Sequence, residues 1–76
     1  MINEDARPKL KKLGLSYKKA RLDAHLTQAE VATKARIHPS YYSRIERGEA
    51  NLGWVILCRI FKALGLEEPD PFDIFK

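Results

Sequence analysis

The stretch LTQAEVATKARIHPSYYSRIERG, residues 26–48, constrains the fold most, because it encodes two short helices around a break. Thr27 and Glu30 form a capping box, in which each side chain accepts a hydrogen bond from the other residue's backbone, and this predicts the start of one helix. Pro39 suits the first position of the next helix, where a missing amide hydrogen is no loss. Gly48 supplies its stop. Two short helices joined by a tight turn therefore form the centre of the fold.

Apolar spacing predicts further helices on both sides of this pair. One apolar face precedes it and consists of Leu13, Tyr17, Ala20 and Ala24. A second apolar stripe follows it and consists of Trp54, Leu57, Ile60, Phe61 and Leu64. Residues 72–75 are predicted to form a last short helical turn, and no segment has the pattern of a strand. The sequence predicts an all-α fold of five helices, with a basic arm at residues 1–12 and one folded domain at residues 13–76.

Positive charge is concentrated in one part of the chain. The net charge of the 76 residues is +4, but residues 1–47 carry +6 and residues 48–76 carry −2. A basic half that holds the helix pair is what a polyanion partner requires. Solvated faces can also divide in this way by chance, so charge alone does not decide the partner.

Several kinds of protein are disfavoured by composition. The longest apolar run, Trp54–Cys58, is far shorter than the roughly 20 residues of a membrane span. No apolar segment follows the first basic residues, which argues against a secretory signal. Cys58 is the single cysteine, so an intrachain disulfide is excluded and a reducing cytoplasm is expected. His25, His38 and Cys58 have no metal-like spacing, and no metal, cofactor or small-molecule ligand is expected.

The second helix of the pair carries hydrogen-bonding side chains beside its apolar row. This pattern is typical of a helix whose outer face contacts a partner molecule. A wider set of positions shares the spacing of a known family: Leu26-Thr27-Gln28, Glu30-Val31-Ala32, Tyr41, Ser43, Ile45-Glu46-Arg47-Gly48, Leu57, Ile60 and Ala63-Leu64-Gly65. On these residues the chain resembles the lambda-repressor-like, Cro/XRE helix-turn-helix family over roughly residues 13–75. The helix-turn-helix itself would span about residues 27–47.

The resemblance implies a non-enzymatic transcription regulator that binds double-stranded DNA. It would bind a near-palindromic operator as a homodimer through the major groove. The protein would be of bacterial or phage origin, would lie in the cytoplasm and would associate with the nucleoid. The short chain and the stretch SYYSRIERGEAN are similar to the controller proteins of restriction–modification systems. Phage Cro-like repressors share most of these features. An antitoxin or adaptor that mainly grips a protein is the alternative from another class, although cations on the second helix favour DNA.

The resemblance also assigns roles to residues. The positions that face the major groove are Arg44, Ser40, Pro39, His38 and Ser43. Arg44 is the leading base reader, because its guanidinium can bind a guanine edge with two hydrogen bonds. For His38, a contact with DNA and a cap on the helix are equally good interpretations. The positions expected to contact phosphate are Gln28, Tyr41 and Arg47; Arg47 could instead only stabilise the helix dipole.

Arg21 and Glu46 match an interior ion pair of the family, which would tie the first helix to the recognition helix. Two departures from the family stand out. Arg36 occupies a turn position where the family prefers glycine, so it must adopt a left-handed conformation or alter the turn. Tyr42 and Phe61 are larger than the usual residues and add volume to the core. His25 ends the first helix at a place where a left-handed residue is also expected.

An excess of large apolar residues in the second half predicts a dimer interface. The candidates are Trp54, Val55, Ile56, Leu66, Phe72, Ile74 and Phe75. Closure of the monomer core by Trp54 and Phe72 is the competing explanation. No nucleophile, acid–base pair or glycine-rich phosphate loop is present, so catalysis has no support.

Overall fold

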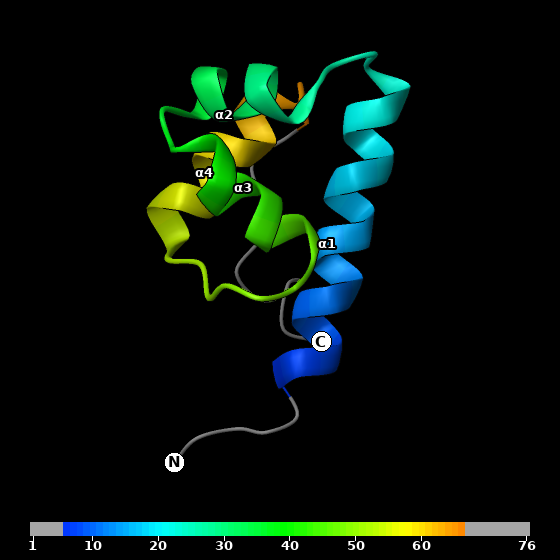
Figure 1. The fold of residues 1–76 in the computed structure, drawn as a ribbon, viewed down its shortest axis with the longest axis vertical. Coiled ribbons are helices and arrows are strands. Elements are labelled where there is room, and N and C mark those ends of the chain that lie inside the picture. Colours follow the sequence, from blue (N-terminus) through cyan, green and yellow to red (C-terminus); the bar gives the residue numbers. More distant parts are fainter. Residues whose placement is uncertain (1–5, 67–76) are drawn as a thin grey trace.

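Four α-helices form the framework of residues 6–66, the part of the chain that the computed structural model describes. They are α1 (Ala6–Asp23), α2 (Gln28–Ala35), α3 (Pro39–Glu46) and α4 (Trp54–Ala63). The long α1 lies along one side of the group formed by the other three (Figure 1). The all-α prediction is confirmed, but five helices are not: the described part holds four. The helical turn expected at residues 72–75 lies outside the described residues.

The first helix begins earlier than the apolar spacing indicated. We expected its face to start at Leu13, whereas α1 starts at Ala6 and includes much of the segment assigned to an arm. Pro8 does not prevent this, because a helix tolerates proline in its first turn, where amide hydrogens have no partner within the helix. Lys and Leu residues with good helix propensity fill the following positions.

Local signals set the ends of the two central helices as predicted. At the start of α2, the Glu30 amide donates to Thr27 Oγ1 at 3.1 Å and the Thr27 amide donates to Glu30 Oε1 at 2.8 Å, which completes the capping box. Pro39 occupies the first turn of α3. Gly48 follows α3 with a φ of 74°, a conformation that glycine adopts without strain.

Two residues other than glycine take the left-handed conformation at helix ends. His25 has φ 59° and Arg36 has φ 60°. After α2, the Ile37 amide donates to the Ala32 carbonyl at 3.0 Å and the Arg36 amide donates to the Thr33 carbonyl at 3.2 Å. These bonds satisfy the last carbonyls of α2, in the usual left-handed termination. Of the two alternatives predicted for Arg36, a left-handed conformation or an altered turn, the structure shows the left-handed conformation. The turn therefore keeps its ordinary form.

The core lies where α2 packs against α4 and where α3 packs against both α1 and α2. Its fully buried side chains of largest volume are Tyr17, Tyr42, Ile60 and Val31. Phe61 places its ring edge-on to Tyr17, with centroids 5.8 Å apart and planes at 82°. Two of the larger residues, Tyr42 and Phe61, are thus accommodated within the core or against it. Buried small residues of α2 allow close approach of the neighbouring helices.

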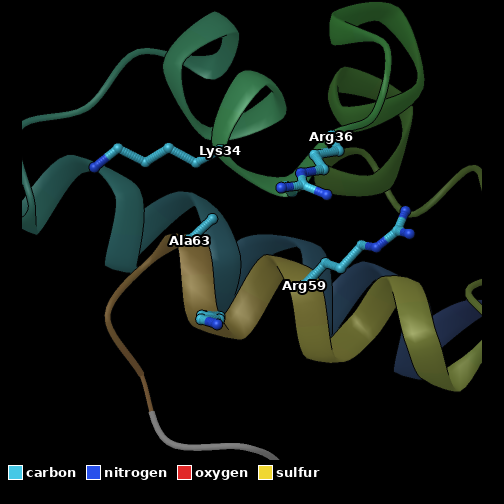
Figure 2. A pocket seen from close by; sticks show the side chains of 6 residues that line it. Lys34, Arg36, Arg59 and Ala63 are labelled. Atoms are coloured by element: carbon cyan, nitrogen blue, oxygen red, sulfur yellow. The ribbon is translucent and has the colours of Figure 1, made fainter.

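A surface feature of this packing is a pocket of about 510 Å³ between the end of α2 and α4, with basic side chains around it (Figure 2). Within residues 6–66, no helix combines the length and the apolar character that crossing a membrane requires.

Candidate nucleic-acid interface

The helix α3 presents two different faces. Its inner face is formed by the buried Tyr42, Ile45 and Glu46. Its outer face carries the exposed Ser40 and Arg44, which lie four residues apart and therefore on one side of the helix. A helix that is anchored by one face and polar on the other can enter a DNA groove without exposing its core. The structure thus places Arg44, the leading candidate for base contact, and Ser40, a second candidate, on an accessible surface.

The first turn of α3 is organised by His38. Its ring Nδ1 lies 3.1 Å from the amide nitrogen of Ser40, which donates to it, and 2.7 Å from Ser40 Oγ. His38 is therefore the N-cap of α3. This is one of its two predicted roles, the other being a contact with DNA. Pro39, the next residue, is exposed beside it. Acceptance of the Ser40 amide hydrogen at Nδ1 leaves Nε2 to carry the ring proton, a donor that is available to a further partner.

At the other end of α3, arginines engage neighbouring groups. Arg47 donates from Nη1 to Ser43 Oγ at 2.9 Å and from Nε to Glu49 Oε1 at 3.1 Å. Arg44 donates from Nη2 to the Glu49 carbonyl at 3.3 Å. The Arg47–Glu49 pair is about half exposed on both sides, so solvent competes with it and it is easily exchanged for another partner. Tyr41, in the same region, donates its hydroxyl to the Asn51 carbonyl at 3.2 Å.

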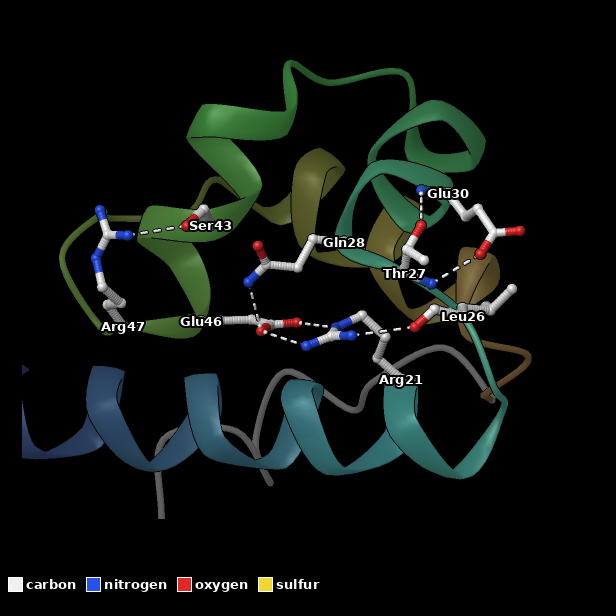
Figure 3. A network of polar contacts seen from close by, with 8 residues as sticks. All are labelled: Arg21, Leu26, Thr27, Gln28, Glu30, Ser43, Glu46 and Arg47. Atoms are coloured by element: carbon white, nitrogen blue, oxygen red, sulfur yellow. Dashed lines mark hydrogen bonds and ion pairs between the residues drawn. The ribbon is translucent and has the colours of Figure 1, made fainter.

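A buried polar network joins α1, α2 and α3 (Figure 3). Arg21 donates from Nε to Glu46 Oε2 at 2.7 Å and from Nη2 to Glu46 Oε1 at 3.2 Å. Its remaining nitrogen, Nη1, donates to the Leu26 carbonyl at 3.0 Å. Gln28, which begins α2, donates from Nε2 to Glu46 Oε1 at 2.9 Å. The ion pair expected from the family resemblance is therefore present, with two parallel hydrogen bonds. Gln28 is the third side chain of the network.

Electrostatics favour the charged forms of this pair. Burial by itself would raise the pKa of the Glu46 carboxyl, but hydrogen bonds led by those of Arg21 outweigh it, and the pKa lies below its usual value. The pKa of Arg21 is raised, chiefly by its hydrogen bond to Glu46. The side chains are only 10% and 3% exposed, so neither charge has much water to replace its partner. The network therefore fixes the angle of α3 against α1 and α2.

Two glycines allow α3 to lie so close to α1: Gly14, which was not among the predicted residues, and Gly48, which was predicted only as the stop of α3. A Cβ at Gly14 would overlap the Glu46 carbonyl oxygen and would lie 2.7 Å from the Ile45 carbonyl oxygen. A Cβ at Gly48 would lie 2.7 Å from the Lys11 backbone. Such distances are shorter than van der Waals contact allows. A glycine inside a helix costs about 1 kcal/mol relative to alanine, and this is the signal by which the sequence could have indicated a close approach at residue 14.

A cleft of about 390 Å³ opens beside the network, between α1 and α3. Basic and polar side chains line it, among them Lys11, Lys18, Gln28, Ser43 and Arg47. The two lysines were not among the predicted site residues. Their spacing of seven puts them on one side of α1, and the tertiary packing of α1 on α3 then brings that side to the residues expected to contact DNA.

The predicted dimer residues are distributed unevenly. Trp54, Val55 and Leu66 are 43%, 63% and 43% exposed, which is high for large apolar side chains. Ile56 is half-buried and packs against the core. Phe72, Ile74 and Phe75 lie outside the described residues. Between residues 6 and 66, no group of His, Cys, Asp and Glu side chains is arranged to hold a metal ion.

Comparison with known proteins agrees with this geometry. The helix-turn-helix family HTH_3 matches residues 18–70. The chain is similar to the restriction–modification controller protein C.AhdI from Aeromonas hydrophila, known from a high-resolution crystal structure. The TM-score is 0.78 and the sequence identity is 28%, over 80% of this chain and 92% of that chain. Among curated protein sequences, none matches this chain.

Proposed function

The chain belongs to the HTH_3, Cro/XRE-like helix-turn-helix family of DNA-binding transcription regulators, which are not enzymes, and we propose that it binds a near-palindromic operator as a homodimer. The observation that carries this proposal is the outer face of α3, where Ser40 and Arg44 are exposed on a helix whose inner face is fixed by the Arg21–Glu46 pair. The similarity to C.AhdI supports a role as the controller of a restriction–modification system.

In this proposal α3 lies in the major groove and Arg44 reads a guanine through two hydrogen bonds. Its present bond, to the Glu49 carbonyl at 3.3 Å, is long and exposed, so the guanidinium is easily released to a base edge. Ser40 and the Nε2 of His38 add single hydrogen bonds near the start of the helix. Pro39 can contact a thymine methyl group, and Ser43 lies closer to the backbone-binding side.

Phosphate binding is proposed for the cleft between α1 and α3. The amide group of Gln28 has two hydrogens, and the bond to Glu46 uses one of them. The other hydrogen, together with the free amides at the start of α2, suits a phosphate oxygen. Arg47 and the lysines of α1 supply positive charge around it. A Tyr41 contact with phosphate requires its hydroxyl to leave the Asn51 carbonyl.

We propose a homodimer because one α3 contacts too few base pairs to specify an operator. A single recognition helix contacts only a few base pairs, and two-fold dimers of this kind place their half-sites about one helical turn, roughly 34 Å, apart. The exposed Trp54, Val55 and Leu66 provide apolar surface for the contact between protomers. Burial of that surface stabilises association by about 25 cal/mol per Å² before the entropic cost of binding is subtracted.

Selection of binders from a random duplex pool, followed by sedimentation of the complex, tests the proposal. We expect an enriched inverted repeat and two protomers per duplex. Gln28→Ala should weaken binding to all sequences alike, with little change in the dependence of affinity on salt, because the amide side chain carries no charge. Ser16→Ala, at an exposed position of α1 outside the cleft, is the matched neutral control. A direct repeat, or one protomer on an unsymmetrical site, would contradict the proposed assembly.

A further inference from the structure

The pocket between α2 and α4 has a strongly basic lining. Lys34 and Arg36 come from the end of α2 and the residue after it, and Arg59 and Lys62 come from α4. The lining also includes two alanines, and no acidic residue. Figure 2 shows Arg36 and Arg59 on facing elements, with Lys34 at the other end of the pocket. The volume of about 510 Å³ is within the usual range of ligand-binding pockets.

These cations have few counter-charges in the described part of the chain. The side chains of Arg36, Arg59 and Lys62 form no hydrogen bond or ion pair with any of residues 6–66, and Lys34 interacts electrostatically with Glu30. Lys34 and Lys62 lie in the last turns of their helices, where the helix dipole already favours a cation. Arg59 lies in the middle of α4 and has no such support. Among the described residues, the cluster therefore has a large excess of positive charge and can accept an anion.

The backbone of Arg36 adds an independent observation. Its left-handed conformation, with φ 60° and ψ 44°, is one that glycine adopts without strain and that a residue with a Cβ does not. Strained residues persist where the side chain has a use that compensates for the strain. Here the side chain extends from the turn into the pocket (Figure 2). The left-handed turn thus places a guanidinium at the pocket, where glycine would leave no charge.

The pocket lies away from the helix that reads DNA. α4 packs chiefly against α2, whereas α3 packs against α1 and α2. Gln28, at the start of α2, faces Glu46 of α3, and Ala35, at the end of α2, faces the pocket and α4. α2 thus separates Arg59 and Lys62 from the outer face of α3. A duplex bound along α3 leaves the pocket open.

Its lining lacks the helix N-termini whose backbone amides many phosphate sites use. Phosphate sites on proteins commonly use free backbone amides at helix N-termini, but both α2 and α4 end at this pocket. The amides of Arg36 and Ile37 already donate to carbonyls of α2. Recognition must therefore come from long side chains, and a guanidinium binds a carboxylate with two parallel hydrogen bonds.

We propose that the α2–α4 pocket docks an acidic segment of a partner protein, with Arg36 and Arg59 as the principal carboxylate-binding residues, while α3 is bound to DNA. The partner segment needs at least two Asp or Glu side chains close enough to reach both guanidinium groups. This docking site is separate from the operator-binding surface, and the proposal does not depend on the identity of the operator.

The first test uses a fluorescein-labelled peptide with four glutamates separated by glycine and serine, and a matched peptide with glutamines. Fluorescence anisotropy should show binding of the glutamate peptide alone. Arg36→Gly/Arg59→Gln should weaken it about tenfold or more, the effect of losing about 1.4 kcal/mol. Lys12→Gln/Lys19→Gln removes equal charge from exposed positions of α1 and should change the affinity less than twofold. Equal losses in both double variants would overturn the proposal.

Stability and DNA competition complete the test. The Tm of Arg36→Gly should be equal to or above that of the parent, so a loss of binding cannot be ascribed to unfolding; Arg59→Gln alone serves if the double variant does not fold. Peptide affinity should be unchanged when a selected operator duplex saturates the protein. Displacement of the peptide by DNA would assign the pocket to the DNA-binding surface and overturn the proposal, whether or not the operator is an inverted repeat.

Discussion

Replacing Glu46 by alanine removes the acceptor that holds three helices together. Arg21 would lose two hydrogen bonds, at 2.7 and 3.2 Å, and Gln28 would lose one, at 2.9 Å. The Arg21 side chain is only 10% exposed, so water cannot fully replace the lost carboxylate. Removal of one partner from a buried pair leaves an uncompensated charge and costs about 3–5 kcal/mol.

That loss is large for a domain of this size. A chain of 76 residues has a free energy of unfolding of about 4–11 kcal/mol, from roughly 0.05–0.15 kcal/mol per residue. With a urea m-value near 1–2 kcal/mol per M, the unfolding midpoint of Glu46→Ala should fall by roughly 1.5–5 M. Circular dichroism at 222 nm, a wavelength that reports helix content, follows this transition at about pH 7.

A double substitution separates the loss of the pair from the burial of an unpaired charge. Arg21→Met/Glu46→Leu replaces both charges by apolar groups of similar size and should be considerably more stable than Glu46→Ala, because no buried charge is left without a partner. A change of less than about 1 kcal/mol in Glu46→Ala would refute the reasoning, since it would place the pair among exposed ion pairs.

The same carboxylate predicts a pH dependence with a definite sign. The pKa of Glu46 is lower in the folded protein than its usual value of 4.5, so the unfolded chain binds the proton more tightly. The stabilisation is therefore complete above about pH 4.5 and is lost as the pH falls through the folded-state pKa. Subtraction of the Glu46→Gln profile from that of the parent isolates this contribution from that of the capping-box carboxylate, and a flat difference below pH 5 would contradict it.

Three further substitutions test other parts of the fold. Gly14→Ala should destabilise by about 1–3 kcal/mol in thermal unfolding, because the overlap with α3 outweighs the gain in helix propensity; Ser16→Ala, exposed on the same helix, should not destabilise. Arg36→Gly should raise the free energy of unfolding by up to about 1 kcal/mol in urea titration, since it removes the left-handed strain, and a decrease would show that no strain is present. Tyr17→Phe should be neutral or stabilising by about 1 kcal/mol, because its buried hydroxyl has no hydrogen-bond partner in the described part of the chain; Tyr41→Phe, which removes a bond to a carbonyl, should lower the Tm.

Local chemistry explains what the sequence could predict of the fold. The capping box of Thr27 and Glu30 and the position of Pro39 depend on neighbours within one turn, so their residue types were sufficient. The left-handed conformation of Arg36 was one of the two options that the resemblance left open, because the family prefers glycine at that turn position. The resemblance to a known family supplied the Arg21–Glu46 pair, whose members are 25 residues apart and could not be matched by spacing.

Tertiary packing explains what the sequence could not predict. The early start of α1 was missed because residues 6–12 have weak apolar periodicity, and helix propensity decided the outcome. The hydrogen bond from Gln28 to Glu46 joins the start of α2 to the end of α3. It therefore depends on the angle at which these two helices cross. The close approach at Gly14 and the role of α1 lysines beside α3 have the same origin.

The most direct test of the account compares the motifs selected from a random duplex pool by the parent protein and by Arg44→Ala at one salt concentration. We predict that the parent protein and the variant both select an inverted repeat. The variant should lose the base preference at one position of each half-site, where the parent discriminates between bases by about 1–3 kcal/mol. Identical motifs for the two proteins, or uniform weakening on every sequence, would contradict the claim that the outer face of α3 reads the operator through Arg44.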